Sequence, residues 1–220
     1  MKKNLSLIFS LSFLLAFIVW TLLVKFFDLS AIGPYGSIVG FSSINEFFHA
    51  ITGVNMDLYN TTDWLGLIPV AFMLGFAILG LVQWIKRKNL IKVDYSILVL
   101  GGYYIVVFLV YFFFEKVVVN YRPILINGYL EASYPSSTTT LVLSVMPTAI
   151  MQLRHRIKKR WARKIINISL MVFTLFMVIA RFVSGVHWFS DIIGGILLSK
   201  ALVSFYDCIC KIKIEKQNLC

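Results

Sequence analysis

The stretch LSLIFSLSFLLAFIVWTLLVKF, residues 5–26, decides the fold class, because it is an apolar run long enough to cross a bilayer. Its one charged residue, Lys25, stands near the end of the run. A cleaved signal peptide is the alternative for an apolar run that follows MKKN. This run is too long for a signal peptide, however, and no A-x-A-like site ends it. The stretch therefore predicts a retained first helix in an integral membrane protein.

The composition of the whole chain agrees with this prediction. Hydrophobic residues make up 59% of the 220 residues and charged residues 14%, and the mean hydropathy is +0.84. A soluble domain usually carries about 25% charged residues. Five further apolar runs follow the first, at 64–85, 95–114, 139–153, 165–183 and 188–210. We therefore expect one all-α domain over residues 1–220, with six transmembrane helices.

The basic residues predict the orientation of the spans. Most of the 21 lysines and arginines fall before the first span, between the second and third, between the fourth and fifth, or after the sixth. These segments share one side of a six-span bundle, and an excess of positive charge marks the cytoplasmic side. Both termini are thus predicted to be cytoplasmic, in a bacterial plasma membrane. The clustering also argues against nucleic acid as the explanation of the net charge of +11.

Two smaller features complete the outline. The connection over residues 27–63 is long for a structureless loop, and it contains Ser43 and Glu46 at capping-box spacing. We expect a short helix there that lies on the outer membrane face. Its apolar stripe would consist of Ile44, Phe47, Phe48 and Ile51. The cysteines Cys208, Cys210 and Cys220 lack metal-binding spacing and are interpreted as small apolar residues near the last span.

Polar residues beside apolar spans are costly, so three groups at the predicted outer ends are candidate functional sites. The first is EKVVVNYRP, residues 115–123, where the planar fork of Arg122 suits phosphate oxygens and Lys116 adds a point charge. Taken alone, these cations could instead anchor the span at the interface. The second is LEASYPSSTTTLVL, residues 130–143, whose hydroxyls suit either a helix cap or an anion site at a helix N-terminus.

The third group is ARFVSGVHWFSDIIGG, residues 180–195, between the fifth and sixth spans. His187 and Asp191 are four residues apart and would share one face of a helix. A carboxylate in that position can hold the imidazole in one tautomer and stabilise its protonated form. Arg181 lies six residues before the histidine. The three groups together could bind a phosphate, neutralise its charge with arginines and attack it with the imidazole.

The third group resembles a motif of the type-2 phosphatidic acid phosphatase family, kin to the vanadium haloperoxidases. The family motif is Ser-Arg, five residues, His, three residues, Asp. This chain has Ala180 and Arg181, then His187 and Asp191 at the same spacing. The resemblance covers roughly residues 115–195 by motif, and the whole chain by the number of spans.

The other two motifs of the family are altered in this chain. The first, Lys, six residues, Arg-Pro, ends here in Arg122 and Pro123, but Glu115 stands in the lysine position and Lys116 comes one residue later. The second, Pro-Ser-Gly-His, reads PSST at residues 135–138.

The resemblance implies a role for each matched residue. His187 would be the nucleophile that forms a phosphohistidine, and Asp191 would orient it. Thr138 stands where the family has the histidine that protonates the leaving group. The phosphate would be bound by Lys116, Arg122, Ser136, Ser137 and Arg181.

The threonine at position 138 cannot serve as an acid near neutral pH, and two expectations follow. A lipid phosphate, whose second pKa is about 6, can leave without a proton, whereas an alkoxide resembles water with a pKa of about 15.7. The chain would then prefer a diphosphate lipid, such as a polyprenyl diphosphate, over phosphatidic acid. Alternatively, another acid such as Glu131 or Glu115 replaces the histidine.

The leading functional prediction is a membrane lipid phosphatase that acts at the extracytoplasmic face on a lipid phosphate or diphosphate. It would need no cofactor or metal, and vanadate would inhibit it. One alternative is a weak or inactive member of the family that binds phospholipid head groups. A transporter is the other alternative, although its polar residues should lie nearer the middle of the membrane. Membrane lipids and the lipid substrate are the expected partners.

Overall fold

The computed structural model describes the backbone of residues 2–217 and the side chains of residues 4–212, so Cys220 and the basic side chains beyond this range lie outside it. The described chain is helical and contains isolated β-bridges in place of strands. Two 3₁₀ turns, Pro34–Gly36 and Leu90–Lys92, interrupt the connections. The helices are α1 (Lys2–Phe26), α2 (Ser42–Thr52), α3 (Met56–Leu65), α4 (Leu67–Arg87), α5 (Tyr95–Lys116), α6 (Ser137–Arg156), α7 (Arg160–Val183) and α8 (Phe189–Gln217).

Five stretches of helix within the described residues are long and apolar enough to cross a membrane. They correspond to α1, to α3 and α4 taken together, and to α5, α7 and α8. The fourth predicted span coincides with α6, which is not among the five. Serines, threonines and a basic last turn reduce the apolar character of this helix.

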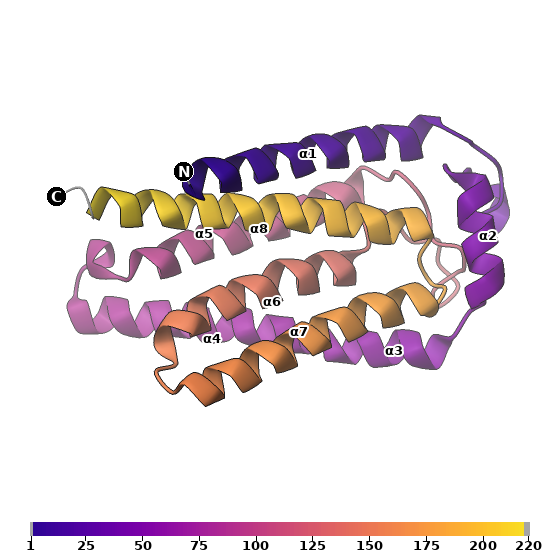
Figure 1. Ribbon diagram of the computed structural model, residues 1–220. Helices are drawn as coiled ribbons and strands as arrows, with labels where there is room; N and C mark the ends of the chain where they lie inside the picture. Colours follow the sequence, from indigo (N-terminus) through magenta and orange to yellow (C-terminus); the bar gives the residue numbers. More distant parts are fainter. Residues whose placement is uncertain (1, 218–220) are drawn as a thin grey trace.

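The helix α6 lies among α4, α5, α7 and α8, and this position explains its composition (Figure 1). Its apolar side chains Val142, Val145 and Met146 are fully buried in the main hydrophobic cluster. Its polar groups meet protein partners: the Tyr103 hydroxyl donates to the Ser144 carbonyl at 3.2 Å, and Tyr104 pairs with Thr148 at 3.2 Å. The hydroxyls of Tyr103, Tyr104 and Thr148, which would be costly against lipid, are thus satisfied inside the protein.

The two ends of the bundle differ in character (Figure 1). Both chain termini lie at one end, and α1 runs beside α8 from there. At the other end α2 crosses the bundle, and the starts of α6 and α8 and the end of α7 come together. Asn45 of α2 is fully buried and binds both the amide and the hydroxyl of Ser190, in the first turn of α8. The helix α2 is therefore docked directly on the helix start that carries the histidine motif.

At two positions of this end, the backbone lies so close to a neighbouring group that only glycine fits. Gly185, in the α7–α8 turn, has φ +65°, and a Cβ there would lie 1.7 Å from the Gly53 carbonyl oxygen. At Gly194 a Cβ would lie 2.5 Å from the Tyr134 ring, so any larger residue would push α8 away from the segment before α6. These contacts set the turn that carries His187 against the segment around Ser133.

Candidate active site

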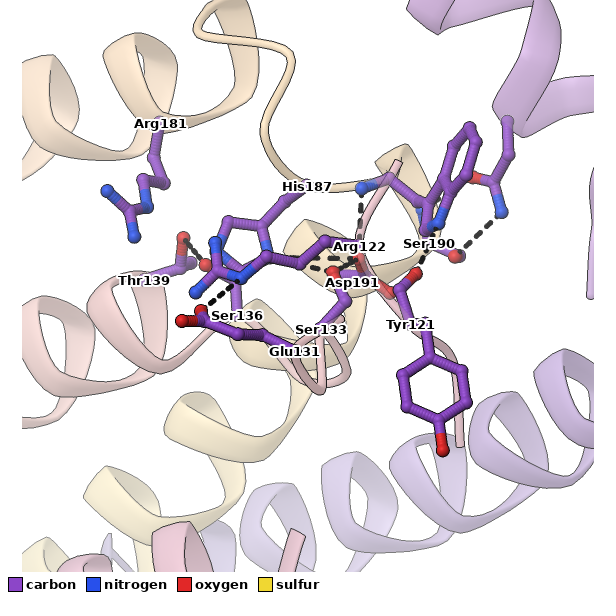
Figure 2. Close-up of polar contacts among 12 residues, drawn as sticks. Tyr121, Arg122, Glu131, Ser133, Ser136, Thr139, Arg181, His187, Ser190 and Asp191 are labelled. Carbon is purple, nitrogen blue, oxygen red and sulfur yellow. Dashed lines mark hydrogen bonds and ion pairs between the residues drawn. The ribbon is translucent and has the colours of Figure 1, made fainter. Parts of the chain in front are cut away.

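The buried polar cluster at the α2 end is built from segments far apart in the sequence (Figure 2). The α5–α6 connection supplies Arg122 and Ser133, α7 supplies Arg181, the α7–α8 turn supplies His187, and the first turn of α8 supplies Asp191. Each of these side chains is buried. The structure therefore gathers residues from all three groups that the sequence singled out.

Both ring nitrogens of His187 have a polar partner. Arg122 Nη1 lies 3.1 Å from Nε2, and the Ser133 hydroxyl lies 3.0 Å from Nδ1. The predicted partner, Asp191, has its Oδ2 3.7 Å from Nδ1, which is beyond hydrogen-bond distance. The carboxylate therefore lies near the imidazole, although His187 is in the turn before α8 and does not share a helix face with Asp191. The direct contact of the ring is with Ser133.

Asp191 is fully buried and held by two donors. Its Oδ2 accepts from the Ser133 hydroxyl at 2.5 Å and from the Trp188 amide at 2.9 Å. The second bond caps the start of α8 with a side chain from its own first turn. Trp188 is fixed in turn, because its indole N–H donates to the Tyr121 carbonyl at 2.7 Å.

The environment of His187 favours the neutral ring. Burial lowers the pKa of His187 well below its usual value of 6.5, and the positive charges of Arg122 and Arg181 lower it further. A neutral imidazole keeps a lone pair on one nitrogen, which a nucleophile needs. At neutral pH this ring is therefore in its reactive protonation state.

This depressed pKa predicts the pH dependence of any reaction in which the His187 ring is the nucleophile. Activity is lost only when the pH falls through the pKa of the folded protein, so kcat/KM should persist below pH 6.5. The measurement is a pH profile of kcat/KM, corrected for the titration of the substrate phosphate recorded by ³¹P NMR. An acidic limb centred at or above pH 6.5 would contradict the prediction.

The guanidinium of Arg122 is 7% exposed and is held from two sides. Its Nε lies 3.1 Å from a carboxylate oxygen of Glu131, an ion pair without the alignment of a hydrogen bond. Its carbon lies 5.7 Å from the centre of the Tyr59 ring. Two backbone hydrogen bonds fold the α5–α6 connection back on itself. The Arg122 amide donates to the Glu131 carbonyl, and the Ser133 amide donates to the Asn120 carbonyl.

Arg181 is held by three residues of α3. Its Nη1 donates to Asp63 at 2.8 Å and to Thr62 at 3.1 Å, and its carbon lies 4.4 Å from the centre of the Tyr59 ring. Only 2% of its side chain is exposed, whereas 46% of the Asp63 side chain is exposed. The same Tyr59 ring therefore contacts both arginines and holds two positive charges close together.

The three residues at the start of α6 that were predicted to lie at the site differ in their surroundings. Ser136 is fully buried, and its hydroxyl donates to Thr139 at 3.1 Å while its amide donates to the Asp191 carbonyl at 3.1 Å. Its groups are thus used to join α6 to α8. Ser137 and Thr138, in the first turn of α6, line a cavity that also reaches His187.

The two charged residues at the end of α5 differ in their relation to the cavity. Lys116 is exposed, and no hydrogen bond or ion pair joins it to another described residue. Glu115 lines the same cavity as Thr138 and His187. Of the two candidate replacement acids, Glu131 is thus paired with Arg122, whereas Glu115 is free of a cationic partner among the described residues.

A cavity of about 390 Å³ leads away from the cluster between α4, α5 and α6. Its polar end contains Ser133, His187 and Thr138, and its walls are mostly apolar side chains of α4 and α5. Elsewhere in the described residues, no three histidine, cysteine, aspartate or glutamate side chains come together as metal ligands. The site thus combines a buried cation pair and a nucleophilic ring with an apolar chamber.

Several residues of the site were not expected from the sequence. Ser133 lies in the segment that the sequence predicts as a helix start or anion site, and Tyr59, Thr62 and Asp63 lie in the connection before the second predicted span. The one signal for these α3 residues was an aspartate, Asp63, directly before an apolar run, where a charge is costly.

Comparisons with known proteins agree with the geometry. The model of the PAP2 superfamily matches residues 6–209. A solved structure, described as the first transmembrane PAP2-type phosphatidylglycerolphosphate phosphatase from Bacillus subtilis, superimposes with a TM-score of 0.65 at 18% sequence identity. The match covers 92% of this chain and 96% of that one. No curated protein sequence matches the chain. The chain is an integral membrane protein and belongs to the PAP2 superfamily.

Proposed function

We propose that this chain is a membrane lipid phosphatase that forms a phosphohistidine on His187. The observation that carries the proposal is the contact between His187 Nε2 and Arg122 Nη1 at 3.1 Å, at the polar end of an apolar cavity. Arg122 can only donate, so this ring nitrogen faces it with its lone pair. A phosphate bound to the arginine would lie against the nucleophilic atom.

The reaction would proceed in two displacements. The Nε2 lone pair attacks phosphorus and a P–N bond forms, while the P–O bond to the leaving group breaks and that oxygen keeps the electron pair. The ring then carries the positive charge of a phosphohistidine with Nδ1 still protonated. Water attacks the phosphorus from the other side, the P–N electron pair returns to Nε2, and the proton of the water passes to solvent.

The main contribution of the protein to this reaction would be positive charge near the phosphate. Arg122 and Arg181 are buried next to one another on the Tyr59 ring, where fixed donors act more strongly than in water. Each arginine is partly neutralised by a half-exposed carboxylate, Glu131 or Asp63. Both carboxylates can turn toward solvent when a phosphate takes their place, because neither is enclosed.

The apolar cavity favours a substrate with a long tail. A second cavity of about 280 Å³ continues between α4 and α5 toward the opposite end, and Met73 lines both cavities. The lining runs from Leu67 to Trp84 on α4, which corresponds to about 25 Å at 1.5 Å per residue. A single leaflet of the hydrocarbon core is about 15 Å deep, half of about 30 Å. A polyprenyl chain would fill this groove better than one acyl chain.

The identity of the leaving group follows from Thr138. This residue lines the cavity beside His187, where a general acid would be needed to protonate an alkoxide. A polyprenyl diphosphate attacked at its terminal phosphorus releases a lipid monophosphate, which needs no proton. We therefore propose a polyprenyl diphosphate as the substrate, with Glu115 as the acid if a monoester is cleaved.

A panel of lipid substrates tests this proposal. Purified protein should cleave polyprenyl diphosphate faster than phosphatidic acid, by about the 10²–10⁴-fold that a positioned acid contributes. The variant Thr138→His should regain phosphatidic acid cleavage with little change toward the diphosphate, and its rate of phosphate release is the readout. Faster cleavage of phosphatidic acid by the unaltered protein would contradict the proposal.

The threonine at position 138, where the family has its acid, also supports a second candidate function. A chain without its acid could bind lipid head groups without turning them over. The same panel distinguishes the two functions, since a binder would release phosphate from none of the lipids while still protecting a lipid phosphate from an added soluble phosphatase.

The proposed topology has six passes, with α6 as the pass shielded by other helices and residues 1–220 as one domain. The connections α4–α5 and α6–α7, together with the helix turns that flank them, carry most of the described basic residues and lie at the end opposite His187. Three residues of the α2 stripe are exposed, Ile44 at 39%, Phe47 at 59% and Ile51 at 66%, as suits a helix in the membrane interface. The fourth, Phe48, packs on Phe182 and Phe189 of the bundle. These features support cytoplasmic termini and an extracytoplasmic site.

A further inference from the structure

The side chain of Ser133 occupies the space between the imidazole and the carboxylate. The residue is 2% exposed, and its hydroxyl oxygen lies 3.0 Å from His187 Nδ1 and 2.5 Å from Asp191 Oδ2. The two side chains that it joins are 3.7 Å apart at their nearest polar atoms. The hydroxyl is therefore the connection between the ring and the carboxylate.

The direction of each hydrogen bond follows from the chemistry of the groups. Arg122 has only donors, so His187 Nε2 must accept and the ring proton of the neutral form must be on Nδ1. An ionised carboxylate only accepts, so the single proton of the Ser133 hydroxyl points at Asp191. The hydroxyl oxygen then accepts from Nδ1–H.

We propose that Ser133 is a positioning residue that couples Asp191 to His187. This inference rests on the function proposed above and adds a member to the machinery of that reaction. The chain of donors, from Arg122 to His187 to Ser133 to Asp191, keeps the ring proton on Nδ1, so the Nε2 lone pair is free to attack once a bound phosphate accepts the Arg122 N–H in its place. When phosphorus bonds to Nε2, the ring becomes positive, and the polarised hydroxyl transmits the negative charge of Asp191 to the Nδ1–H bond.

A double-mutant cycle tests this coupling. The variants are Ser133→Ala, Asp191→Asn and the double variant, and the readout is phosphate release from polyprenyl diphosphate. Ser133→Ala should lower kcat about 10- to 100-fold with KM changed less than twofold, because the contact acts on the reacting ring rather than on the bound head group. The double variant should be no slower than Asp191→Asn alone, because the carboxylate acts through the hydroxyl.

Two further variants show whether the hydroxyl itself is responsible. Ser144→Ala is the matched control, since Ser144 is also a fully buried serine but its hydroxyl has no hydrogen-bond partner within residues 4–212. Its kcat should equal that of the unaltered protein. Ser133→Thr keeps the hydroxyl and should retain more activity than Ser133→Ala.

The outcomes separate this inference from the proposed function. If His187→Ala abolishes turnover and Ser133→Ala leaves kcat within twofold, the coupling through Ser133 is wrong and the phosphohistidine mechanism stands. Effects of Ser133→Ala and Asp191→Asn that multiply in the double variant would also overturn the coupling. If His187→Ala keeps full turnover, the proposed function itself fails.

Discussion

Replacing His187 with alanine is expected to lower phosphate release from a lipid diphosphate by about 10⁴-fold or more, because the substitution removes the attacking atom. The remaining arginines can still bind the substrate, so KM should change far less than kcat. The measurement is steady-state phosphate release from detergent-solubilised protein. The expected loss is larger than that for any other residue of the site, since no neighbouring side chain can take over the attack.

The control for this variant is His155→Ala. His155 is an exposed histidine in the last turn of α6, at the opposite end of the bundle from the site. Its substitution should leave kcat and KM unchanged. A His187→Ala protein that keeps more than a tenth of the activity would show that the imidazole is not the nucleophile.

Replacing Arg181 with alanine should cost about 10²–10³-fold in kcat/KM, because one of two buried positive charges that stabilise the transition state is lost. Inhibition by vanadate, which has the charge and shape of a phosphate, should weaken in parallel. Arg181→Lys should rescue only part of the loss, since a lysine cannot bind Asp63 and Thr62 while also reaching a phosphate.

The first turn of the same helix offers a matched control. Arg163→Ala removes a cation from α7 far from the site, where its guanidinium donates to the Arg154 carbonyl at 3.5 Å. Activity and vanadate inhibition should be unaffected. If Arg181→Ala is folded, as judged by its thermal unfolding, and retains its activity and its vanadate inhibition, the assignment of Arg181 to the phosphate is wrong.

Much of the fold could be predicted from the sequence, because transmembrane helices depend on local composition. The apolar runs coincide with α1, α4, α5, α7 and α8. The exception is α6, which lies between other helices and therefore carries hydroxyls that a hydropathy criterion counts against it. Its helical form was expected, but its shielded position depends on packing that no local pattern records.

The candidate site could be predicted where spacing along one segment determines geometry. His187 and Asp191 are four residues apart, and the structure places them side by side. Their bridging partner Ser133 comes from a segment more than 50 residues away, and no spacing relates the two. The same holds for Asp63, whose partner Arg181 lies in another helix. Long-range contacts of this kind depend on tertiary structure alone.

The predicted phosphate-binding role of Lys116 rests on a motif in which the lysine is displaced by one residue. The lysine is one residue later than in the family motif, and one residue on a helix corresponds to a rotation of about 100°. The structure accordingly shows Lys116 exposed, whereas the preceding residue, Glu115, lines the cavity. Both side chains are exposed, but that of Glu115 also borders the cavity that reaches His187.

The central claim is that His187 Nε2 becomes bonded to phosphorus, and trapping the phosphoenzyme tests it most directly. Protein mixed with a terminally ³²P-labelled polyprenyl diphosphate would be quenched in alkali within milliseconds, and the labelled residue identified. The account predicts label on His187 that is stable in alkali and labile in acid, and no label in His187→Ala. Phosphate release without labelled protein, or label on another residue, would contradict it.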